Sequence, residues 1–278
     1  MFEPVLKWSG SKRSQASEII SFFPKEIDTY YEPFLGGGSV FRALVESDIK
    51  VNKYILSDNN SDLMDLWQVI ADAPNTLASE YEEYWNTMNK DVPKENQLHR
   101  RNFYEIIRKA FNETRNPYAF MFLNRTCFNG LIRYNSKGEF NSPFHLNRNG
   151  IQPDKLAKII KEWSDLINFN DVEFRCCSYE DIKPKPNDFV YIDPPYANTK
   201  GMYQEGGFDN QKMFDWMRNL PCGYALSYDG LSGNQNKTFN VPKDIYKKHH
   251  YIRSGNSSFK RITESNKKAE VYESIYLN

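Results

Sequence analysis

One tetrapeptide, Asp193-Pro194-Pro195-Tyr196, has residue types suited to holding an amino group. A residue before proline is driven to an extended conformation, and two successive prolines fix φ twice and remove two N–H donors. The loop therefore presents two rigid acceptors, the Asp193 carboxylate and the Pro194 carbonyl. Such a pair can hold both hydrogens of an aromatic amine and localise its lone pair for attack on a methyl sulfonium. Tyr196 is expected to stack on a base flipped out of a duplex; the alternative is a proline-rich strand exit that ends a sheet.

A glycine-rich turn, Glu32-Pro33-Phe34-Leu35-Gly36-Gly37-Gly38-Ser39-Val40, is the second candidate site. Glycine lets the backbone adopt positive φ and approach a ligand closely. The turn lacks the G-K-[S/T] of a P-loop, and Phe41 stands where a dinucleotide-binding pattern needs its third glycine. Asp58, twenty residues after Gly38, suits the two ribose hydroxyls of an adenosine. The pattern predicts a nucleoside ligand without a phosphate; the alternative is a structural turn with Asp58 as a helix N-cap.

Apolar and alternating runs predict the strands that position these motifs. The nearly all-apolar run 188–193 is typical of a strand buried on both faces, and it leads directly into the Asp193 loop. The other predicted strands are 30–33, 51–58, 172–176, 223–228, and a C-terminal hairpin of 246–252 with 269–277. Helical patterns cover 14–22, 40–46, 62–70, 76–88, 102–111, 119–124 and 154–167. This alternation predicts an α/β fold with a mainly parallel sheet, interrupted by a helix-rich insertion over about 65–167.

The charge distribution favours a polar partner, although the net charge of zero by itself argues against nucleic acid. Residues 58–92 contain eight acidic residues and one lysine, whereas residues 94–148 contain ten Lys or Arg and four acids. Residues 237–268 contain nine Lys or Arg and two acids. The basic stretches predict a surface for a polyanion; the alternative is that they are only solvated faces.

Composition excludes several other classes of protein. The four cysteines form no C-x-x-C pair and the four histidines have no metal-ligand spacing, so neither a zinc site nor a disulfide framework is expected. No apolar run approaches the length of a transmembrane helix, and the first residues lack a secretion signal. We expect no metal, no membrane and a cytoplasmic location.

The chain resembles the Dam-type N6-adenine DNA methyltransferases, which include adenine methylases of restriction–modification systems. Five segments carry the resemblance in the family's order: Leu6–Lys12 is similar to its K-W-x-G-x-K motif, 32–39 to E-P-F-x-G-x-G-S, 57–63 to D-x-N-x-x-L, 123–144 to its recognition hairpin, and 177–181 to the segment before D-P-P-Y. The resemblance implies a Rossmann-like S-adenosylmethionine-dependent methyltransferase fold with a C-terminal β-hairpin and an inserted helical target-recognition domain that carries a β-hairpin. It implies residues 1–64 and 168–278 as the catalytic domain and 65–167 as the target-recognition domain, with the DNA-reading hairpin at about 125–144.

The resemblance also implies roles for individual residues. Catalysis is assigned to Asp193, Pro194, Pro195 and Tyr196. S-adenosyl-L-methionine is expected to contact Trp8, Lys12, Phe34, Gly36, Gly38, Asp58, Tyr179 and Asp193. Contacts with double-stranded DNA are expected from Arg125, Phe128, Asn129, Leu131, Arg133 and Asn135. Phe128, where Dam proteins often have tyrosine, is expected to wedge at the flipped base, and Arg133 to read a guanine edge.

Further expectations concern partners and alternatives. Lys260, Arg261, Lys267 and Lys268, in the loop of the C-terminal hairpin, are expected to grip phosphates, or else to be solvated. We expect a monomer encoded by a bacterium or a phage. It either belongs to a restriction–modification system, with a cognate restriction endonuclease as partner, or acts as a solitary methylase. The alternatives are N4-cytosine methylation, methylation of RNA or of a protein amide, and an inactive DNA-binding regulator. The recognised base sequence is not readable from these residues, beyond a guanine 5′ of the target that Arg133 suits.

Overall fold

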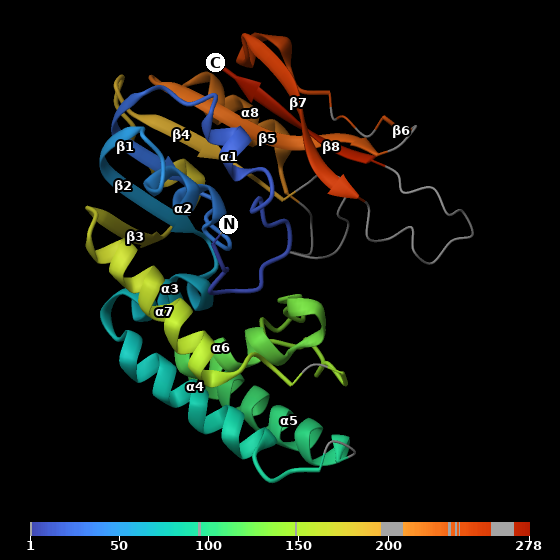
Figure 1. Cartoon of the computed structure of the whole chain (residues 1–278). Coiled ribbons are helices and arrows are strands. Elements are labelled where there is room, and N and C mark those ends of the chain that lie inside the picture. The colour runs from blue at the N-terminus through green and yellow to red at the C-terminus, as the bar shows by residue number, and fades with distance from the viewer. Residues whose placement is uncertain are drawn as a thin grey trace. The chain divides into compact units, whose positions relative to one another are not determined.

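The computed structural model (Figure 1) describes residues 2–93, 96–147, 149–195, 208–232, 235–236, 238, 240–256 and 270–278. The chain forms two units, one of Met1–Ser11 with Asn60–Cys176 and one of Lys12–Asn59 with Cys177–Asn278. The predicted insertion of 65–167 lies inside the first unit. That unit also takes the first 11 residues and the strand at 172–176, which had been predicted to belong to the catalytic domain.

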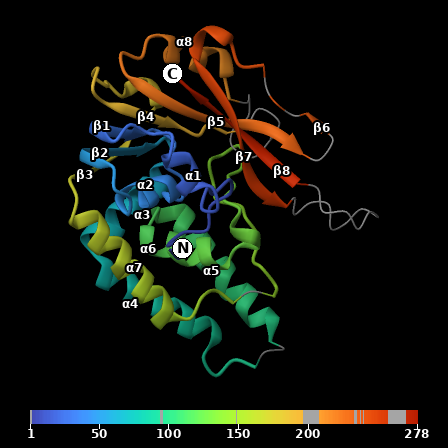
Figure 2. The same cartoon turned by 45° about the horizontal axis from the view of Figure 1, so that its top comes forward.

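The second unit is built on a twisted sheet. Its strands are β1 (Glu26–Glu32), β2 (Lys50–Asp58), β4 (Phe189–Ile192), β5 (Gly223–Ser232), β6 (Gln235–Asn236), β7 (Lys248–Asn256) and β8 (Glu270–Leu277). Within the unit they follow the order β2-β1-β4-β5-β8-β7, and β6 pairs with β5. The first four strands are parallel, whereas β8 runs antiparallel to both β5 and β7 (Figure 2). The predicted Rossmann-like fold and C-terminal hairpin are confirmed.

The order in which strands are added to the sheet reverses between the neighbouring strands β1 and β4. Tyr30 pairs with Phe189 and Tyr31 with Val190. From β1 the chain continues to β2 on one side, and from β4 it continues to β5 on the other. Ligands of open α/β sheets bind in the crevice outside the carboxyl ends of strands at such a switch point. Both chemical motifs, after Glu32 and after Ile192, leave the sheet there.

Short helices complete the second unit. They are α1 (Ala16–Ile20), α2 (Ser39–Val45), α8 (Asn210–Arg218), and the 3-10 turns η2 (Tyr179–Asp181) and η3 (Lys243–Ile245). Helix α8 was not predicted from the sequence. Its N-cap Asp209 accepts a hydrogen bond from Lys212 N, and its buried residues Met213, Phe214 and Met217 pack into the apolar core with Val190. The core thus holds β4 and β5 in place behind the Asp193 loop.

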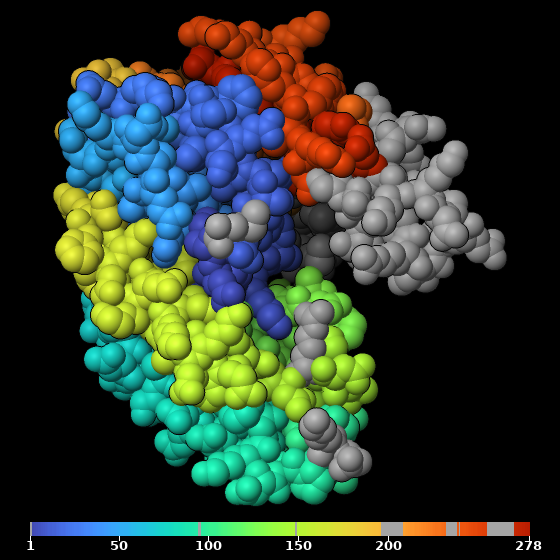
Figure 3. All heavy atoms as spheres, viewed as in Figure 1, coloured from blue at the N-terminus to red at the C-terminus, as the bar shows by residue number. Residues whose placement is uncertain are grey.

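The first unit is mainly helical. Its elements are α3 (Ser61–Asp72), α4 (Pro74–Asn89), α5 (Gln97–Thr114), α6 (Pro117–Thr126), η1 (Phe128–Gly130), α7 (Pro153–Asn168) and β3 (Val172–Cys176). Three of these helices begin with proline, whose fixed φ and missing N–H suit the first helical position. The indoles of Trp67 and Trp163 are fully buried and 5.2 Å apart, which joins α3 to α7. Helices α4 and α7 pack against each other, and their surfaces adjoin in the view of Figure 3.

The predicted helices and strands are all present, with shifted ends. β1 begins at Glu26 rather than 30, because the alternating polar residues before Tyr30 pair along β2. Aromatic side chains of α5 and α6 pack in the interior of the unit: Tyr104, Phe111, Phe120 and Phe122 are buried and Phe103 is partly buried. No helix in the described part of the chain has the length and apolar character needed to cross a membrane.

Candidate active site

Asp193 follows β4 directly and its carboxylate is paired with Lys12. Lys12 Nζ lies 2.8 Å from Asp193 Oδ1 and 3.5 Å from Glu273 Oε2 of β8. The side chain of Lys12 is 4% exposed, whereas those of Asp193 and Glu273 are 17% and 20% exposed. The buried ammonium of Lys12 thus forms ion pairs with two carboxylates, both of which are partly exposed. Pro194, the next residue, is buried, and Pro195 is partly buried.

The charges of Lys12, Asp193 and Glu273 determine which of these side chains carry a proton at neutral pH. Burial alone lowers the pKa of Lys12, but the negative charges of Asp193 and Glu273 outweigh burial and the net pKa is raised. Burial raises the pKa of Asp193 to about 6; Lys12 opposes this rise, and the charge of Glu273 adds to it. At neutral pH Asp193 is therefore a carboxylate, an acceptor without a proton, and Lys12 is the group that keeps it so.

A third carboxyl, Glu32 at the end of β1, lies in the same field. It is 3% exposed and accepts a 2.8 Å hydrogen bond from the hydroxyl of Tyr30. Burial raises the pKa of Glu32 to about 8; the Tyr30 bond lowers it and the charge of Asp193 raises it further. Glu32 is thus mostly protonated and uncharged at neutral pH. The positive charge of Lys12 is therefore balanced by Asp193 and Glu273.

The glycine turn after β1 is oriented by the end of β2. Gly36 (φ +48°) and Gly38 (φ +65°) adopt left-handed conformations, and Gly38 is the N-cap of α2. Gly36 N donates to Asp58 Oδ2 at 3.2 Å, and Leu35 N donates to Ser57 O at 2.9 Å. The Asp58 carboxylate is thereby fixed at the carboxyl edge of the sheet while it remains partly exposed. This position suits an acceptor for hydroxyl groups of a ligand.

Aromatic rings lie beside this carboxylate. Cys177 N donates to Asp58 O at 3.2 Å, which places η2 next to the end of β2. Tyr179 of η2 stacks on Phe34 with ring centroids 5.6 Å apart, and both rings contact Phe208. The rings of Phe34 and Tyr179, close to a polar carboxylate, form an apolar wall of the kind that a flat heterocycle packs against.

The remaining predicted residues of this site are placed as follows. Trp8 belongs to the first unit, where it is partly buried. Tyr196, like the basic residues of the loop between β7 and β8 (Lys260, Arg261, Lys267 and Lys268), lies outside the described residues. Within the described part of the chain, no group of three or more His, Cys, Asp or Glu side chains is arranged to hold a metal ion.

The predicted DNA-reading hairpin, residues 125–144, belongs to the first unit and is largely irregular. Antiparallel bridges join Cys127 to Phe144 and Tyr134 to Phe140, and Asn141 N donates to Arg133 O at 2.9 Å. Gly130 (φ +69°) packs so closely on the N-terminal segment that a Cβ there would lie 2.5 Å from Lys7 Cβ. The chain therefore does turn back on itself here, as predicted, with few ladder hydrogen bonds to fix it.

Four of the predicted DNA contacts are at least partly exposed on this hairpin. Phe128 is 45% exposed, and its ring stacks on His145 at 5.3 Å. Asn129 and Arg133 are exposed and Leu131 is partly exposed. An exposed phenylalanine and an exposed arginine on one hairpin have the chemistry to wedge between bases and to read a base edge.

The other two predicted contacts have different roles in the structure. Arg125 is 5% exposed, and its Nη2 donates to the carbonyl oxygens of Pro4 and Val5 at 2.6 Å each. Burial lowers its pKa to about 10. Arg125 therefore ties α6 to the N-terminal segment, and we do not retain it among the DNA contacts. The amide of Asn135 shapes the hairpin turn: Nδ2 donates to Glu139, and Oδ1 accepts from the backbone N–H groups of Lys137 and Glu139.

Three residues of the site escaped the sequence analysis. Glu273 lies in the middle of a C-terminal strand that is mainly apolar and aromatic, a signal that went unused. Glu32 was noted only as part of the glycine turn, although its burial beside Asp193 makes it part of the charge group. Phe208 precedes the helix that was missed, and no periodic pattern points to it.

Known proteins resemble this chain over most of its length. The chain is 33% identical to the Type II methyltransferase M.MjaIII of Methanocaldococcus jannaschii, over 77% of this chain and 75% of that protein. It is also 33% identical to the DNA adenine methylases of Vibrio cholerae and Escherichia coli, over 69% of this chain; the matched region spans 64% of the length of each of those two. Residues 8–221 match the family described as D12 class N6 adenine-specific DNA methyltransferase. The chain therefore belongs to the D12 class of N6 adenine-specific DNA methyltransferases.

Proposed function

We propose that this chain transfers a methyl group from S-adenosyl-L-methionine to the N6 amino group of an adenine in a specific double-stranded DNA sequence. The observation that carries the proposal is the Asp193 carboxylate, which is held at the sheet's switch point by Lys12 at 2.8 Å. The alternative of N4-cytosine methylation uses the same acceptors on a different amine.

The residues around the glycine turn fit the proposed donor. The Asp58 carboxylate, oriented by Gly36 N, is suited to the ribose hydroxyls, and the stacked Phe34 and Tyr179 rings are suited to the adenine face. The turn lacks the sequence pattern of a P-loop, which is in keeping with a ligand that has no phosphates. When bound, S-adenosyl-L-methionine supplies a methyl group made electrophilic by its sulfonium. We propose Lys12 and Trp8 as further contacts, and Gly36 and Gly38 as positions that allow close backbone approach.

The chain's own contribution to the reaction is to hold the amine. The Asp193 carboxylate and the Pro194 carbonyl would accept the two N–H hydrogens of the target amino group, which favours a tetrahedral nitrogen with a localised lone pair. Lys12 keeps Asp193 ionised, and the rigid prolines keep both acceptors in place. Asp193 accepts a proton only as the nitrogen acquires positive charge. We propose Tyr196 as the residue that stacks on the flipped base.

The hairpin would supply the DNA contacts. We propose that Phe128 wedges at the vacated position, that Arg133 reads a guanine beside the target, and that Asn129 and Leu131 contact the duplex. All the residues proposed for these roles belong to one chain, so we propose that the protein acts as a monomer. Because one similar protein is named a Type II methyltransferase, a restriction endonuclease of the same sequence specificity is the partner class to test.

A single experiment tests the proposal. The purified chain is incubated with S-adenosyl-L-methionine and duplex DNA, and the DNA is digested to nucleosides and analysed by mass spectrometry. N6-methyladenine is the expected product. N4-methylcytosine as the sole product would refute the adenine assignment, and methylation of RNA but not of duplex DNA would refute the substrate. Mapping of modified positions in an expressing host then gives the recognition sequence.

A further inference from the structure

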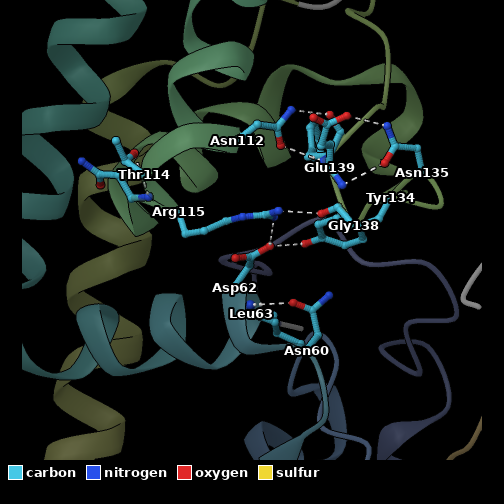
Figure 4. A network of polar contacts seen from close by, with 12 residues as sticks. Asn60, Asp62, Leu63, Asn112, Thr114, Arg115, Tyr134, Asn135, Gly138 and Glu139 are labelled. Carbon is cyan, nitrogen blue, oxygen red and sulfur yellow. Dashed lines mark hydrogen bonds and ion pairs between the residues drawn. The ribbon is translucent and has the colours of Figure 1, made fainter.

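The hairpin of residues 125–144 is attached to the body of its unit by a cluster of polar contacts. Among the described residues, its only β-bridges are the two at Cys127 and Tyr134, and side-chain contacts add to the backbone hydrogen bonds across it. Tyr134 is the neighbour of the exposed Arg133, and its hydroxyl donates to Asp62 Oδ2 at 2.6 Å (Figure 4). Because Tyr134 directly follows Arg133 in the chain, this bond helps to place the backbone from which Arg133 projects.

Asp62 binds a second part of the hairpin through Arg115. Arg115 Nη1 donates to the same Asp62 Oδ2 at 3.1 Å, while its Nη2 donates to the carbonyl of Gly138 at 2.6 Å. Arg115 is the C-cap of α5 in a left-handed conformation (φ +54°), and its guanidinium lies 5.9 Å from the Tyr134 ring centroid. One carboxylate oxygen therefore joins the hairpin strand, the hairpin turn and the end of α5 (Figure 4).

The carboxylate itself is firmly placed. Asp62 is 6% exposed and lies in the first turn of α3, where the helix dipole favours a negative charge. The N-cap Asn60 fixes that turn by accepting from Leu63 N at 3.0 Å. Burial, together with the hydrogen bond to Asp62, raises the pKa of Tyr134, so its hydroxyl remains a donor throughout the physiological range.

We propose that Asp62 is a positioning residue for DNA recognition: through Tyr134 and Arg115 it sets the position of the hairpin that presents Arg133. The inference rests on the proposed function. In sequence Asp62 stands only four residues after Asp58 and in the same motif, which would assign it to the donor site. The hydrogen bonds of its side chain assign it to the DNA side of the reaction instead.

The test separates the two substrates. Tyr134→Phe removes the hydroxyl and leaves the ring, Asp62→Asn removes the charge, and a third variant combines both. Asp65→Asn removes an exposed carboxylate from the same helix and serves as the control. For each protein, steady-state methylation gives kcat and the KM values for a cognate duplex and for S-adenosyl-L-methionine. Sequence preference is measured as the ratio of kcat/KM for the cognate duplex to kcat/KM for a duplex with one changed base pair. The affinity for S-adenosyl-L-methionine is measured separately, without DNA.

The expected result is a rise in KM for DNA on the order of tenfold in both single variants, the loss expected for one hydrogen bond to a charged group. The preference for the cognate duplex falls, while donor affinity stays within about twofold of that of the wild type. The double variant loses less than the product of the two single losses, because both act on the same bond: Tyr134→Phe removes its donor, and Asp62→Asn removes the charge of its acceptor. Asp65→Asn behaves as the wild type.

Three outcomes would overturn the inference. The first is weakened donor binding with an unchanged KM for DNA. The second is an unchanged DNA preference in both single variants. The third is a uniform loss of kcat on all duplexes with a lowered melting temperature, which would make the cluster purely structural. Failure of the proposed function would show separately, since the wild type would then methylate no duplex at all.

Discussion

Lys12 Nζ lies 2.8 Å from Asp193 Oδ1, although the two residues are separated by 181 positions of sequence. The same ammonium lies 3.5 Å from Glu273, and the nearby Glu32 is held mostly protonated by burial. The acceptor strength of Asp193 is therefore set by a small group of charges rather than by the loop sequence alone.

Replacing Asp193 by alanine should reduce methyl transfer by on the order of 10³-fold, because one of two acceptors for the amino group is lost. Binding of duplex DNA, measured by fluorescence anisotropy, should remain. Asp193→Asn is the matched control, since it keeps the side-chain volume and one acceptor but loses the charge opposite Lys12. Its rate should fall between those of the wild type and Asp193→Ala. Wild-type rates in Asp193→Ala would refute the role of the carboxylate.

The rate of methylation should fall on the acid side with a midpoint set by Asp193, and Glu273 should move that midpoint. Because the pKa of Asp193 is raised to about 6, the acceptor is lost as the pH falls through that value. The negative charge of Glu273 contributes to the rise, so Glu273→Gln should shift the acid limb to lower pH. Single-turnover rates between about pH 5 and 8 measure the shift.

Glu270→Gln is the control for that experiment, since Glu270 lies on the same strand and is exposed. Its acid limb should coincide with that of the wild type. A Glu273→Gln limb that moves to higher pH, or does not move, would contradict the proposed electrostatic link.

The buried Glu32 should make stability depend on pH. Its pKa in the folded protein, about 8, lies above the ordinary value of 4.5, so the folded state binds the proton more tightly. The stability that this proton contributes is complete below about pH 4.5 and is lost as the pH rises to about 8. Glu32→Gln mimics the protonated acid. It should be more stable than the wild type by roughly 5 kcal/mol at about pH 9 and equal to it at about pH 4.

Urea unfolding at both pH values measures this difference. Asp48→Asn, at an exposed surface pair with Lys25, should show no comparable gain at high pH. An equal or lower stability of Glu32→Gln at high pH would show that folding does not raise the pKa of Glu32.

On the hairpin, Arg133 and Lys137 should differ in their effect on specificity. Both side chains are exposed and separated by a single turn. Arg133→Ala should weaken binding of the cognate duplex by roughly 1–3 kcal/mol and relax the preference at one base pair. Lys137→Ala should weaken binding of all duplexes alike and lessen the salt dependence. Competition binding with a set of single-substituted duplexes distinguishes the two patterns, and an unchanged preference in Arg133→Ala would contradict base reading.

The sequence predicted elements and motifs well, and contacts between distant residues less well. The strand before Asp193 and the acid at the end of β2 were recognisable, because buried strands and glycine turns have local patterns. The pairing of Lys12 with Asp193 and Glu273 was not, because it depends on how β8 lies in the sheet. The resemblance implied a DNA contact for Arg125, whereas its side chain is buried and donates to the backbone oxygens of Pro4 and Val5 instead.

The position of Glu273 on β8 has a practical consequence. The region that matches the family ends at residue 221, so a comparison limited to it includes Asp193 and Lys12 but omits a carboxylate that acts on them. Two members with identical motifs can therefore differ in their acid tolerance because of a single residue in the last strand. Screening substitutions at position 273 offers a route to adenine methylases adapted to acidic or alkaline reaction mixtures without altering the residues that define the family.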